Sequence, residues 1–434
     1  MSTLAFTTCA PVVSQRAGAR ADEHGIPAAR QVSPQVEPSS KPLHCQVPRA
    51  TQNADPAPAR LGSDELKLPR FFAALRELKA NRRTDHVRVM WLGDSHTAAD
   101  FWPHQLRIAL QGRFGDGGPG FLYTGLKLYR HGSAAIAREG KWRSQPRAPA
   151  TIIPSFDRRF GLGGIRMVPQ SGGALVSLSL KEPGEGQLRW ELLYRLPHAR
   201  SSLQVSLGSQ TETLSRAAAD SEQGTLMQSV RLEGAAADSF RVSDFRNQPE
   251  VFGAIAERTA PGVVLDTLGI NGARIKTTMV WNEGAWVREV RRRSPDLLIV
   301  AFGANEVGDR VAPWRYRADF KELVGRVRRG SPGCECLIVG PIERAARNWK
   351  PHPRMKPIED MQRETARELG CEFFSSVDAM GGPGSLKTWS ELSPQWARRD
   401  RVHLTVRGYR ELGRRLADTV LTSFDAERSR RAAH

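Results

Sequence analysis

Continuous apolar runs of strand length alternate with helical stripes over the first and last parts of the chain. The runs lie at 87–92, 263–268 and 297–302, a helical pattern covers 64–80, and stripes with helical spacing follow at 320–327 and 409–420. Alternation of strand and helix is typical of an α/β domain with a parallel sheet. The pattern therefore predicts such a domain, with its strands buried on both faces.

The pattern of apolar and polar residues changes between residues 133 and 261. Residues 174–180, 188–194 and 202–207 alternate apolar and polar positions, and clusters of Gly, Pro and Ser separate them. Short alternating runs of this kind are typical of an antiparallel β-sandwich. Because the α/β pattern resumes afterwards, we expect the sandwich to be inserted in the α/β domain.

This organisation divides the chain into five segments. They are a disordered leader or linker at 1–64, the first part of the α/β domain at 65–132, the inserted β-sandwich at 133–261, the second part of the α/β domain at 262–425, and a disordered tail at 426–434. The leader is rich in Ala, Pro, Ser, Gln and Arg and has no repeating apolar face, which is typical of disorder.

The leader gives no clear signal peptide. Its apolar residues 4–6 are interrupted by Thr7 and Thr8, and no basic residue precedes them. The chain also has no stretch of about 18 apolar residues, so we expect no membrane-spanning helix.

Residues suited to nucleophilic catalysis stand at two distant places. Ser95 leaves a tight turn, Gly93-Asp94-Ser95, at the end of the first predicted strand, and Asp400 and His403 stand three residues apart near the C-terminus. A serine nucleophile needs a base, and the base needs an orienting carboxylate. Each motif alone fits a plainer interpretation, since Asp94 or Ser95 could cap a helix and Asp400 could begin one.

Two further loops follow predicted strands, and they complete a family pattern. Gly272 follows the run at 263–268, and Asn305 and Glu306 follow the run at 297–302. Together with Gly93-Asp94-Ser95 and Asp400-x-x-His403, they resemble in order the four sequence blocks of the GDSL-type SGNH hydrolases. One departure is His96, where the family name implies leucine.

The resemblance implies a flavodoxin-like, three-layer hydrolase domain and ester hydrolysis. It makes Ser95 the nucleophile, His403 the general base and Asp400 the residue that holds the imidazole. It also implies an oxyanion hole formed by the backbone amides of Ser95 and Gly272 and the side chain of Asn305.

A closer similarity is to the extracytoplasmic subgroup that includes bacterial peptidoglycan O-acetylesterases. It rests on the segments 93–101 and 113–121, and that subgroup has a carbohydrate-binding-like β module between its first two blocks. The resemblance implies a serine esterase that removes O-acetyl groups from a glycan such as peptidoglycan, in the periplasm or another extracytoplasmic location. A glycan O-acetyltransferase with the same triad and a non-catalytic glycan-binding protein remain alternatives.

The chain is strongly basic, with a formal net charge of +18 and 40% hydrophobic residues among its 434. Such a charge favours anionic partners. The arginines are spread along the chain without a nucleic-acid-binding motif, so we expect no nucleic acid partner and consider association with an anionic wall polymer.

No cofactor or metal is expected. His104 and His352 have no partners at metal-ligand spacing, and the glycine-rich stretch 115–120 lacks the Gly-Lys-Ser/Thr ending of a phosphate-binding loop. The five cysteines, Cys9, Cys45, Cys334, Cys336 and Cys371, do not form a disulfide framework. Cys9 and Cys45 lie in the leader, whereas Cys336 and Cys371 begin two short apolar strands, where we expect buried free thiols.

Overall fold

A computed structural model of the chain describes residues 65–127, 129–148, 157–216, 226–309 and 311–432. The predicted leader and the signal-peptide question at residues 4–8 lie outside this part. Within it, the predicted α/β domain with an inserted sandwich is confirmed, as the strand pairing and the core show. No described helix has the length and apolarity needed to cross a membrane.

The centre of the fold is a sheet of five parallel strands. In spatial order they are β13 (Val263–Gly269), β1 (Val87–Gly93), β14 (Leu297–Ala301), β15 (Glu335–Val339) and β16 (Glu372–Phe374). Counted along the chain within this sheet, the order is 2-1-3-4-5, which is the flavodoxin-like order. The direction of the sheet reverses at β1, so ligands are expected at the carboxyl end of that strand.

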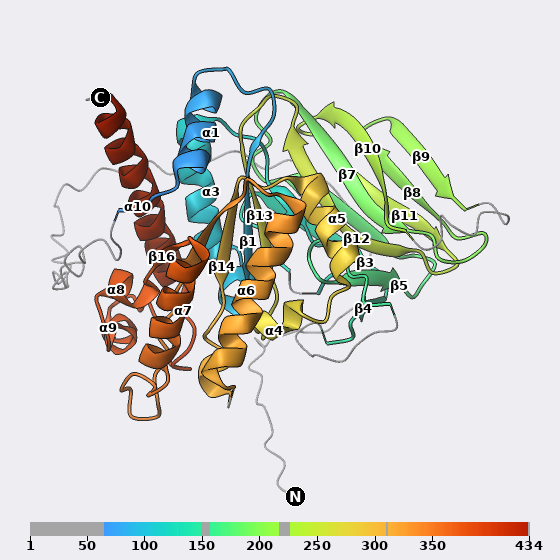
Figure 1. Ribbon diagram of the computed structural model, residues 1–434. Helices are drawn as coiled ribbons and strands as arrows, with labels where there is room; N and C mark the ends of the chain where they lie inside the picture. Colours follow the sequence, from blue (N-terminus) through green and yellow to red (C-terminus); the bar gives the residue numbers. More distant parts are fainter. Residues whose placement is uncertain (1–64, 128, 149–156, 217–225, 310, 433–434) are drawn as a thin grey trace, which may run out of the picture. The chain divides into compact units, whose positions relative to one another are not determined.

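Helices cover both faces of the parallel sheet (Figure 1). On one face lie α1 (Pro69–Lys79), α2 (Ser95–Ala98), α3 (Phe101–Phe114), α8 (Ser376–Met380), α9 (Ser385–Glu391) and α10 (Val406–Ala432). On the other lie α4 (Ile275–Thr278), α5 (Glu283–Arg293), α6 (Pro313–Gly330) and α7 (Met355–Leu369), and a 3₁₀ turn, η1 (Glu306–Gly308), follows β14.

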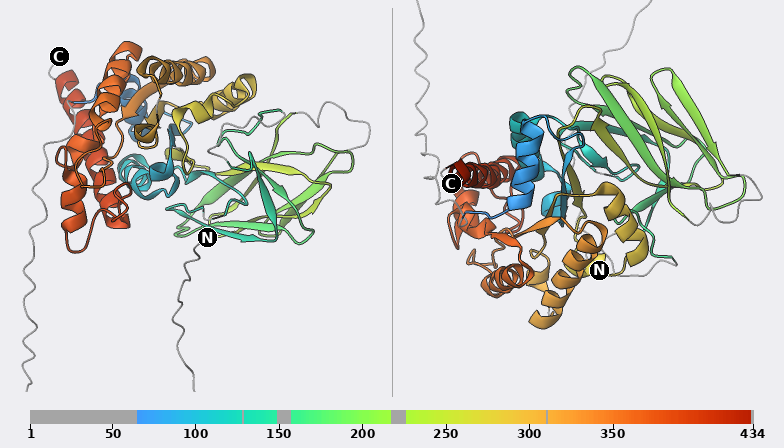
Figure 2. Two further views of the ribbon diagram at one scale, coloured as in Figure 1. Left: turned by 90° about the horizontal axis from the view of Figure 1, so that it is seen from below. Right: turned by 45° about the horizontal axis from the view of Figure 1, so that its top comes forward.

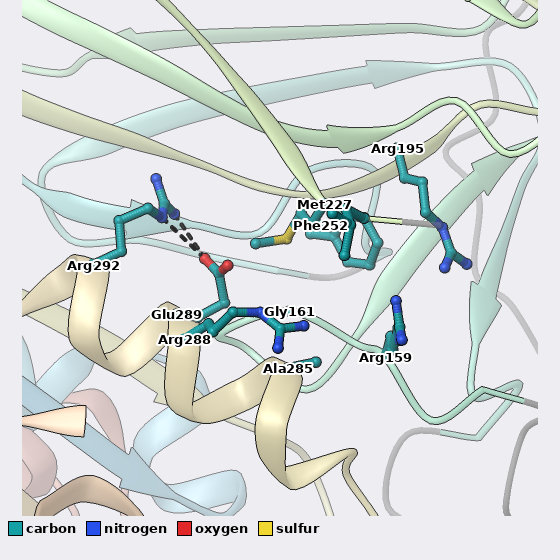
Figure 3. A pocket seen from close by; sticks show the side chains of 10 residues that line it. Arg159, Gly161, Arg195, Met227, Phe252, Ala285, Arg288, Glu289 and Arg292 are labelled. Carbon is teal, nitrogen blue, oxygen red and sulfur yellow. Dashed lines mark hydrogen bonds and ion pairs between the residues drawn. The ribbon is translucent and has the colours of Figure 1, made fainter. Parts of the chain in front are cut away.

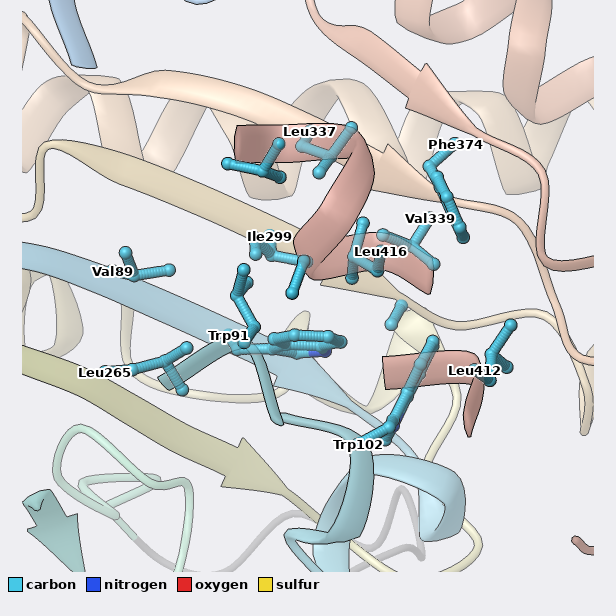
Figure 4. Packing of buried hydrophobic residues seen from close by; sticks show 14 of the residues in the cluster. Val89, Trp91, Trp102, Leu265, Ile299, Leu337, Val339, Phe374, Leu412 and Leu416 are labelled. Atoms are coloured by element: carbon cyan, nitrogen blue, oxygen red, sulfur yellow. The ribbon is translucent and has the colours of Figure 1, made fainter. Parts of the chain in front are cut away.

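Successive strand residues feed two separate cores, because side chains alternate across a strand. Val89 and Trp91 of β1 pack with Trp102 of α3 and with Leu412 and Leu416 of α10 (Figure 4). The neighbouring residues of β1 point to the other face and join the core under α5, α6 and α7. Burial on both faces explains why these strands appear in the sequence as uninterrupted apolar runs.

Ten antiparallel strands and one short pairing segment lie between β1 and β13 along the chain. One sheet contains β10 (Gln228–Ala235), β7 (Gln187–Arg195), β12 (Glu250–Arg258), β5 (Arg166–Pro169) and β4 (Trp142–Gln145), and β2 (Gly120–Leu122) pairs with β12. The other contains β3 (Ala134–Glu139), β6 (Leu175–Leu180), β11 (Phe240–Arg246), β8 (Ser202–Leu207) and β9 (Gln210–Ser215).

These two sheets share a hydrophobic core and form the predicted sandwich. Trp190 of β7 stacks on Phe240 of β11 with ring centroids 5.4 Å apart. Figure 2 shows the antiparallel strands gathered to one side of the parallel sheet, away from α7 to α10. Strand β2 pairs with β12, so the antiparallel sheet includes residues of the segment 65–132, which we assigned to the α/β domain. The domain boundary at residue 132 stays a prediction.

Strand β12 joins the sandwich to the α/β domain. Its residues from Glu250 to Ala256 are all buried. Val251 and Ala254 face the sandwich core, whereas Phe252 and Ile255 pack into the core beneath α5 and α6. The insertion is therefore attached to the α/β domain by the packing of β12, in addition to the two peptide connections at its ends.

A buried ionic cluster strengthens the same joint. Arg293 of α5 donates to both carboxylate oxygens of Asp266 in β13, at 2.7 and 2.9 Å, and to Glu257 of β12 at 2.5 Å. Arg88 of β1 donates to Glu257 as well, at 3.0 Å. Burial alone would raise the pKa of Glu257, but Arg293 and Arg88 outweigh it and hold that pKa well below its usual range.

Two expectations from the sequence are wrong. Helix α10 continues to Ala432, so residues 426–432 are not a disordered tail. Glu427 forms ion pairs with Arg76 and Arg431 that stabilise the last turns.

Cys336 and Cys371 are not free thiols but form a disulfide. They lie just where β15 and β16 pair in parallel, with Cα atoms 4.8 Å apart. Cys334 is a buried free thiol, and Cys9 and Cys45 lie outside the described residues.

Replacing Arg293 by methionine should lower the free energy of unfolding by about 3 to 5 kcal/mol, because buried Asp266 loses its cation and buried Glu257 keeps only one arginine, Arg88. Urea denaturation measures this change. The control is Lys356→Met, which breaks an ion pair between Lys356 and Asp360 on the surface of α7 and should change stability far less. Equal losses in the two variants would contradict the stabilising role of the buried cluster.

Candidate active site

The loops that carry the candidate residues leave the parallel sheet at one level. Gly93 at the end of β1 is paired with Gly269 of β13 and with Ala301 of β14. Ser95, Gly272 and Asn305 follow these three positions by two to four residues. In-register pairing therefore delivers the serine, the glycine and the carboxamide to the same edge of the sheet.

The turn that presents Ser95 is tight. Asp94 caps α2 by accepting a hydrogen bond from the backbone N–H of His96 at 2.9 Å, and Ser95 is the first residue of the helix. A β-carbon at Gly93 would lie 2.1 Å from the hydroxyl oxygen of Thr97, and one at Gly269 would lie 2.3 Å from the backbone of Ala98. Glycine at both positions lets α2 fold back directly onto the strand ends.

Ser95, His403 and Asp400 form one hydrogen-bonded chain. The hydroxyl oxygen of Ser95 is 3.1 Å from Nε2 of His403, and Nδ1 of the same ring is 2.9 Å from Oδ2 of Asp400. These separations are within hydrogen-bonding distance. The structure thus brings Ser95 together with two residues that lie more than 300 positions further along the chain.

Asp400 is fixed by its own loop rather than by a helix. Its Oδ1 accepts hydrogen bonds from the backbone N–H groups of Val402 and His403, both at 2.9 Å, and α10 begins only at Val406. Partial burial would raise the pKa of Asp400, but those N–H groups and the His403 ring outweigh it, so the pKa is lowered. The carboxylate is therefore charged at neutral pH and can stabilise an imidazolium.

Gly272 and Asn305 lie next to each other across the two following loops. Gly272 adopts a φ of +74°, and the side-chain nitrogen of Asn305 donates to the carbonyl of Ala273 at 2.9 Å. That bond uses one of the two amide hydrogens of Asn305 and leaves the other available.

An ion pair that the sequence did not reveal clamps the same two loops. Arg274, two residues after Gly272, donates to both oxygens of Asp309, at 2.5 and 2.8 Å. Arg274 also donates to the carbonyl of Gly272 at 3.2 Å. Single charged residues in loops carry no periodic signal, so the pair becomes apparent only in three dimensions.

His96 also has a structural role that the sequence analysis missed. Its Nδ1 is 2.8 Å from the hydroxyl of Tyr409 in α10, and its ring lies 5.2 Å from the ring of His403. Burial, with a smaller contribution from His403, lowers the pKa of His96 to about 3. His96 is therefore a neutral side chain packed against the candidate base.

Two buried carboxyls lie behind the site. Burial, with a smaller contribution from nearby Glu306, raises the pKa of Asp94 to about 8. Burial likewise raises the pKa of Glu306 to about 7, although its Oε1 accepts the backbone N–H of Ile275 at 2.8 Å. Near neutral pH these groups bind protons, which leaves Asp400 as the charged partner of His403.

The other candidates remain outside this arrangement. His352 accepts a backbone hydrogen bond from Arg354, and the glycine-rich loop at 115–120 packs against β12 and β13. No group of three or more metal-ligating side chains occurs within the described part of the chain.

Comparison with known proteins identifies the family. The model of the GDSL-like lipase/acylhydrolase family matches residues 233–411, a range that includes Gly272, Asn305, Asp400 and His403 and begins after Ser95. Among curated proteins, no relative matches.

One solved structure extends the similarity across the insertion. A structure described as a peptidoglycan O-acetylesterase in action matches with 25% identity and a TM-score of 0.70, covering 85% of this chain and 100% of that chain. A family two carbohydrate esterase from Cellvibrio japonicus matches with 10% identity and a TM-score of 0.28, covering 67% of this chain and 99% of that one. A lipase/acylhydrolase from Enterococcus faecalis matches with 15% identity and a TM-score of 0.28, covering 37% and 76%.

Residues 233–411 belong to the GDSL-like lipase/acylhydrolase family, and the chain as a whole is similar to the peptidoglycan O-acetylesterase. It is a carboxylic ester hydrolase.

Replacing Glu306 by glutamine should reduce the pH dependence of stability. The pKa of Glu306 is about 7 in the folded chain and about 4.3 when unfolded, so between these values the folded state holds a proton that the unfolded state has lost. Stability therefore falls as the pH rises through this window. Urea denaturation at pH 5 and pH 7.5 should show a smaller fall for Glu306→Gln than for the parent. An equal fall in both proteins would contradict the raised pKa.

Proposed function

We propose that the protein removes O-acetyl groups from a glycan, with Ser95 as the nucleophile. The observation that carries this proposal is the continuous hydrogen-bonded chain from Ser95 through His403 to Asp400, with distances of 3.1 and 2.9 Å. A serine hydroxyl becomes a competent nucleophile when a neighbouring imidazole takes its proton.

In the first step, the hydroxyl of Ser95 attacks the ester carbonyl while Nε2 of His403 accepts its proton. Asp400 accepts a hydrogen bond from Nδ1 and stabilises the imidazolium, which then protonates the sugar oxygen as the ester C–O bond breaks and the sugar leaves with a free hydroxyl. The carbonyl oxygen becomes negatively charged in this step. The backbone N–H groups of Ser95 and Gly272 and the free amide hydrogen of Asn305 are the proposed donors to that oxygen.

In the second step, water attacks the acyl group on Ser95, with His403 again acting as base. The site supports access by water, since the side chains of His403 and Asp400 are 37% and 45% exposed. Transfer to a second sugar hydroxyl would require exclusion of water from the acyl-enzyme. The exposure of the triad therefore favours hydrolysis over the transferase alternative.

The glycan assignment rests on the similarity to the peptidoglycan O-acetylesterase, which spans the insertion as well as the hydrolase domain. The disulfide between Cys336 and Cys371 supports an extracytoplasmic location, because disulfides persist in oxidising compartments. We propose peptidoglycan or a related wall glycan as the substrate.

The direct test is Ser95→Ala assayed with p-nitrophenyl acetate. Loss of the nucleophile should lower kcat by several orders of magnitude. The matched control is Ser375→Ala, because Ser375 caps α8 by accepting the backbone N–H of Asp378. That variant should lose about 0.5 to 2 kcal/mol of stability and retain turnover. Surviving activity in Ser95→Ala would reject Ser95 as the nucleophile.

The oxyanion role of Asn305 can be tested separately. Asn305→Ala should lower kcat by about 100- to 1000-fold, because one preorganised donor to the developing charge is lost. Asn282→Ala is the control, since Asn282 caps α5 by accepting a hydrogen bond from Ala285, and it should alter stability rather than kcat. A reduction in kcat of less than about threefold in Asn305→Ala would argue against this role.

A further inference from the structure

A cavity of about 360 Å³ lies between the start of α3 and β3. One wall begins at Ala99, four residues after Ser95, and continues through Phe101 and His104 of α3. The opposite wall is formed by residues 129–132, which lead into the insertion, and by β3 of the insertion itself. The cavity is therefore built jointly by the hydrolase domain and the inserted sandwich.

Packing connects this cavity to the triad. Phe101 in its wall stacks on Tyr409, with ring centroids 6.1 Å apart, and Tyr409 is hydrogen-bonded to His96. The ring of His96 in turn lies against His403. Four residues of helix correspond to a rise of about 6 Å, so the cavity starts within roughly one helical turn of Ser95.

A second hollow continues away from the site along α3. Its volume is about 450 Å³, and it shares His104, Gly132 and Lys181 with the first cavity. It extends past Ile108 and Gln111 toward the far end of α3. Together the two form a trough between α3 and the insertion, which suits an extended substrate.

The end of the trough nearest Ser95 is positively charged. Arg130, Lys181 and Arg410 line it, and none of them has a carboxylate partner within the described residues. Lys181 donates to the carbonyl of His131 at 2.7 Å, which leaves its charge uncompensated.

The one acidic residue in this lining is already neutralised. Asp100 is fully buried and accepts two hydrogen bonds from Arg107, at 2.8 and 2.9 Å. The hydroxyl of Tyr129 is buried there and has no hydrogen-bond partner among the described groups. Burial lowers the pKa of His104, and Arg107, Lys181 and Arg410 lower it further, in agreement with a positive potential in the trough.

Another arginine-rich cavity provides a contrast. It has a volume of about 290 Å³ and lies between α5 and the insertion (Figure 3). Arg292 in its lining pairs with Glu191 and Glu289, and Arg195 pairs with Glu250 and Asp157. Those two cations are compensated within the fold, whereas Arg130, Lys181 and Arg410 are available to a ligand.

We propose that Arg130, Lys181 and Arg410 form a subsite that binds a carboxylate of the glycan next to the acetylated sugar. This inference rests on the proposed function and deepens it, because it specifies an anionic glycan as the substrate. Arginine suits such a role, since its planar guanidinium can donate two parallel hydrogen bonds to one carboxylate.

The test compares two substrates of equal size. Soluble O-acetylated peptidoglycan fragments are used as such, and also after their carboxylates have been coupled to methylamine to form neutral amides. For each protein, kcat/KM on the fragments is divided by kcat/KM on p-nitrophenyl acetate. Any change in the triad that affects both substrates equally then cancels from this ratio. The variants are Arg410→Gln and Arg130→Gln, and Arg367→Gln on the exposed surface of α7 removes the same charge elsewhere.

Amidation should lower the ratio of the parent and of Arg367→Gln about tenfold, as expected for loss of a charge-assisted contact. Each subsite variant should show a lowered ratio on the charged fragments and little further loss on amidation. Equal effects of amidation in parent and subsite variants, or no effect in any of them, would overturn the subsite. Neither result bears on Ser95, whose role is decided by Ser95→Ala on p-nitrophenyl acetate.

Discussion

The parallel pairing of β1 with β13 on one side and β14 on the other is the constraint on which the site depends. Gly93, Gly269 and Ala301 are level in this pairing, so the three following loops open at the same height. A shift of one residue in either ladder would move Gly272 or Asn305 away from Ser95 and reverse the face of every side chain in that strand. The two buried cores above and below the sheet oppose such a shift, because each accepts only alternate strand residues.

Charge is distributed around this frame according to burial. Asp94 and Glu306, which lie in the protein interior, are pushed toward the neutral form. Asp400, which is half exposed and accepts two backbone hydrogen bonds, stays ionised. The protein thereby keeps one negative charge next to His403 and avoids a cluster of repelling carboxylates beneath it.

Much of the fold could be predicted from local pattern. The uninterrupted apolar runs at 87–92, 263–268 and 297–302 indicated strands buried on both faces, and the alternation at 174–180 indicated a sandwich. The partners of Ser95 were recognisable because they stand in an ordered set of motifs. His96 with Tyr409 and Arg274 with Asp309 were not, because contacts between single residues in loops or between distant elements leave no periodic trace.

The incorrect predictions from the sequence also concern contacts between segments that are distant along the chain. Cys336 and Cys371 were each assigned to a strand, yet their disulfide follows only from the adjacency of β15 and β16, which local pattern does not give. The last turns of α10 were expected to be disordered, whereas the ion pairs of Glu427 with Arg76 and Arg431 stabilise them as helix. Short β2 was hidden because three residues are too few to show alternation.

The position of the insertion also has a consequence for how the chain acquires its structure. Strand β1 has no sheet neighbour until β13 and β14 have been synthesised, so it must wait as an unpaired apolar segment while the sandwich emerges. Contacts of such long sequence separation slow folding and leave apolar edges open to aggregation. The sandwich can complete its own hydrogen-bonded sheets during this interval. Strand β12 is then already in place when the remaining strands of the parallel sheet have been synthesised and pack against it.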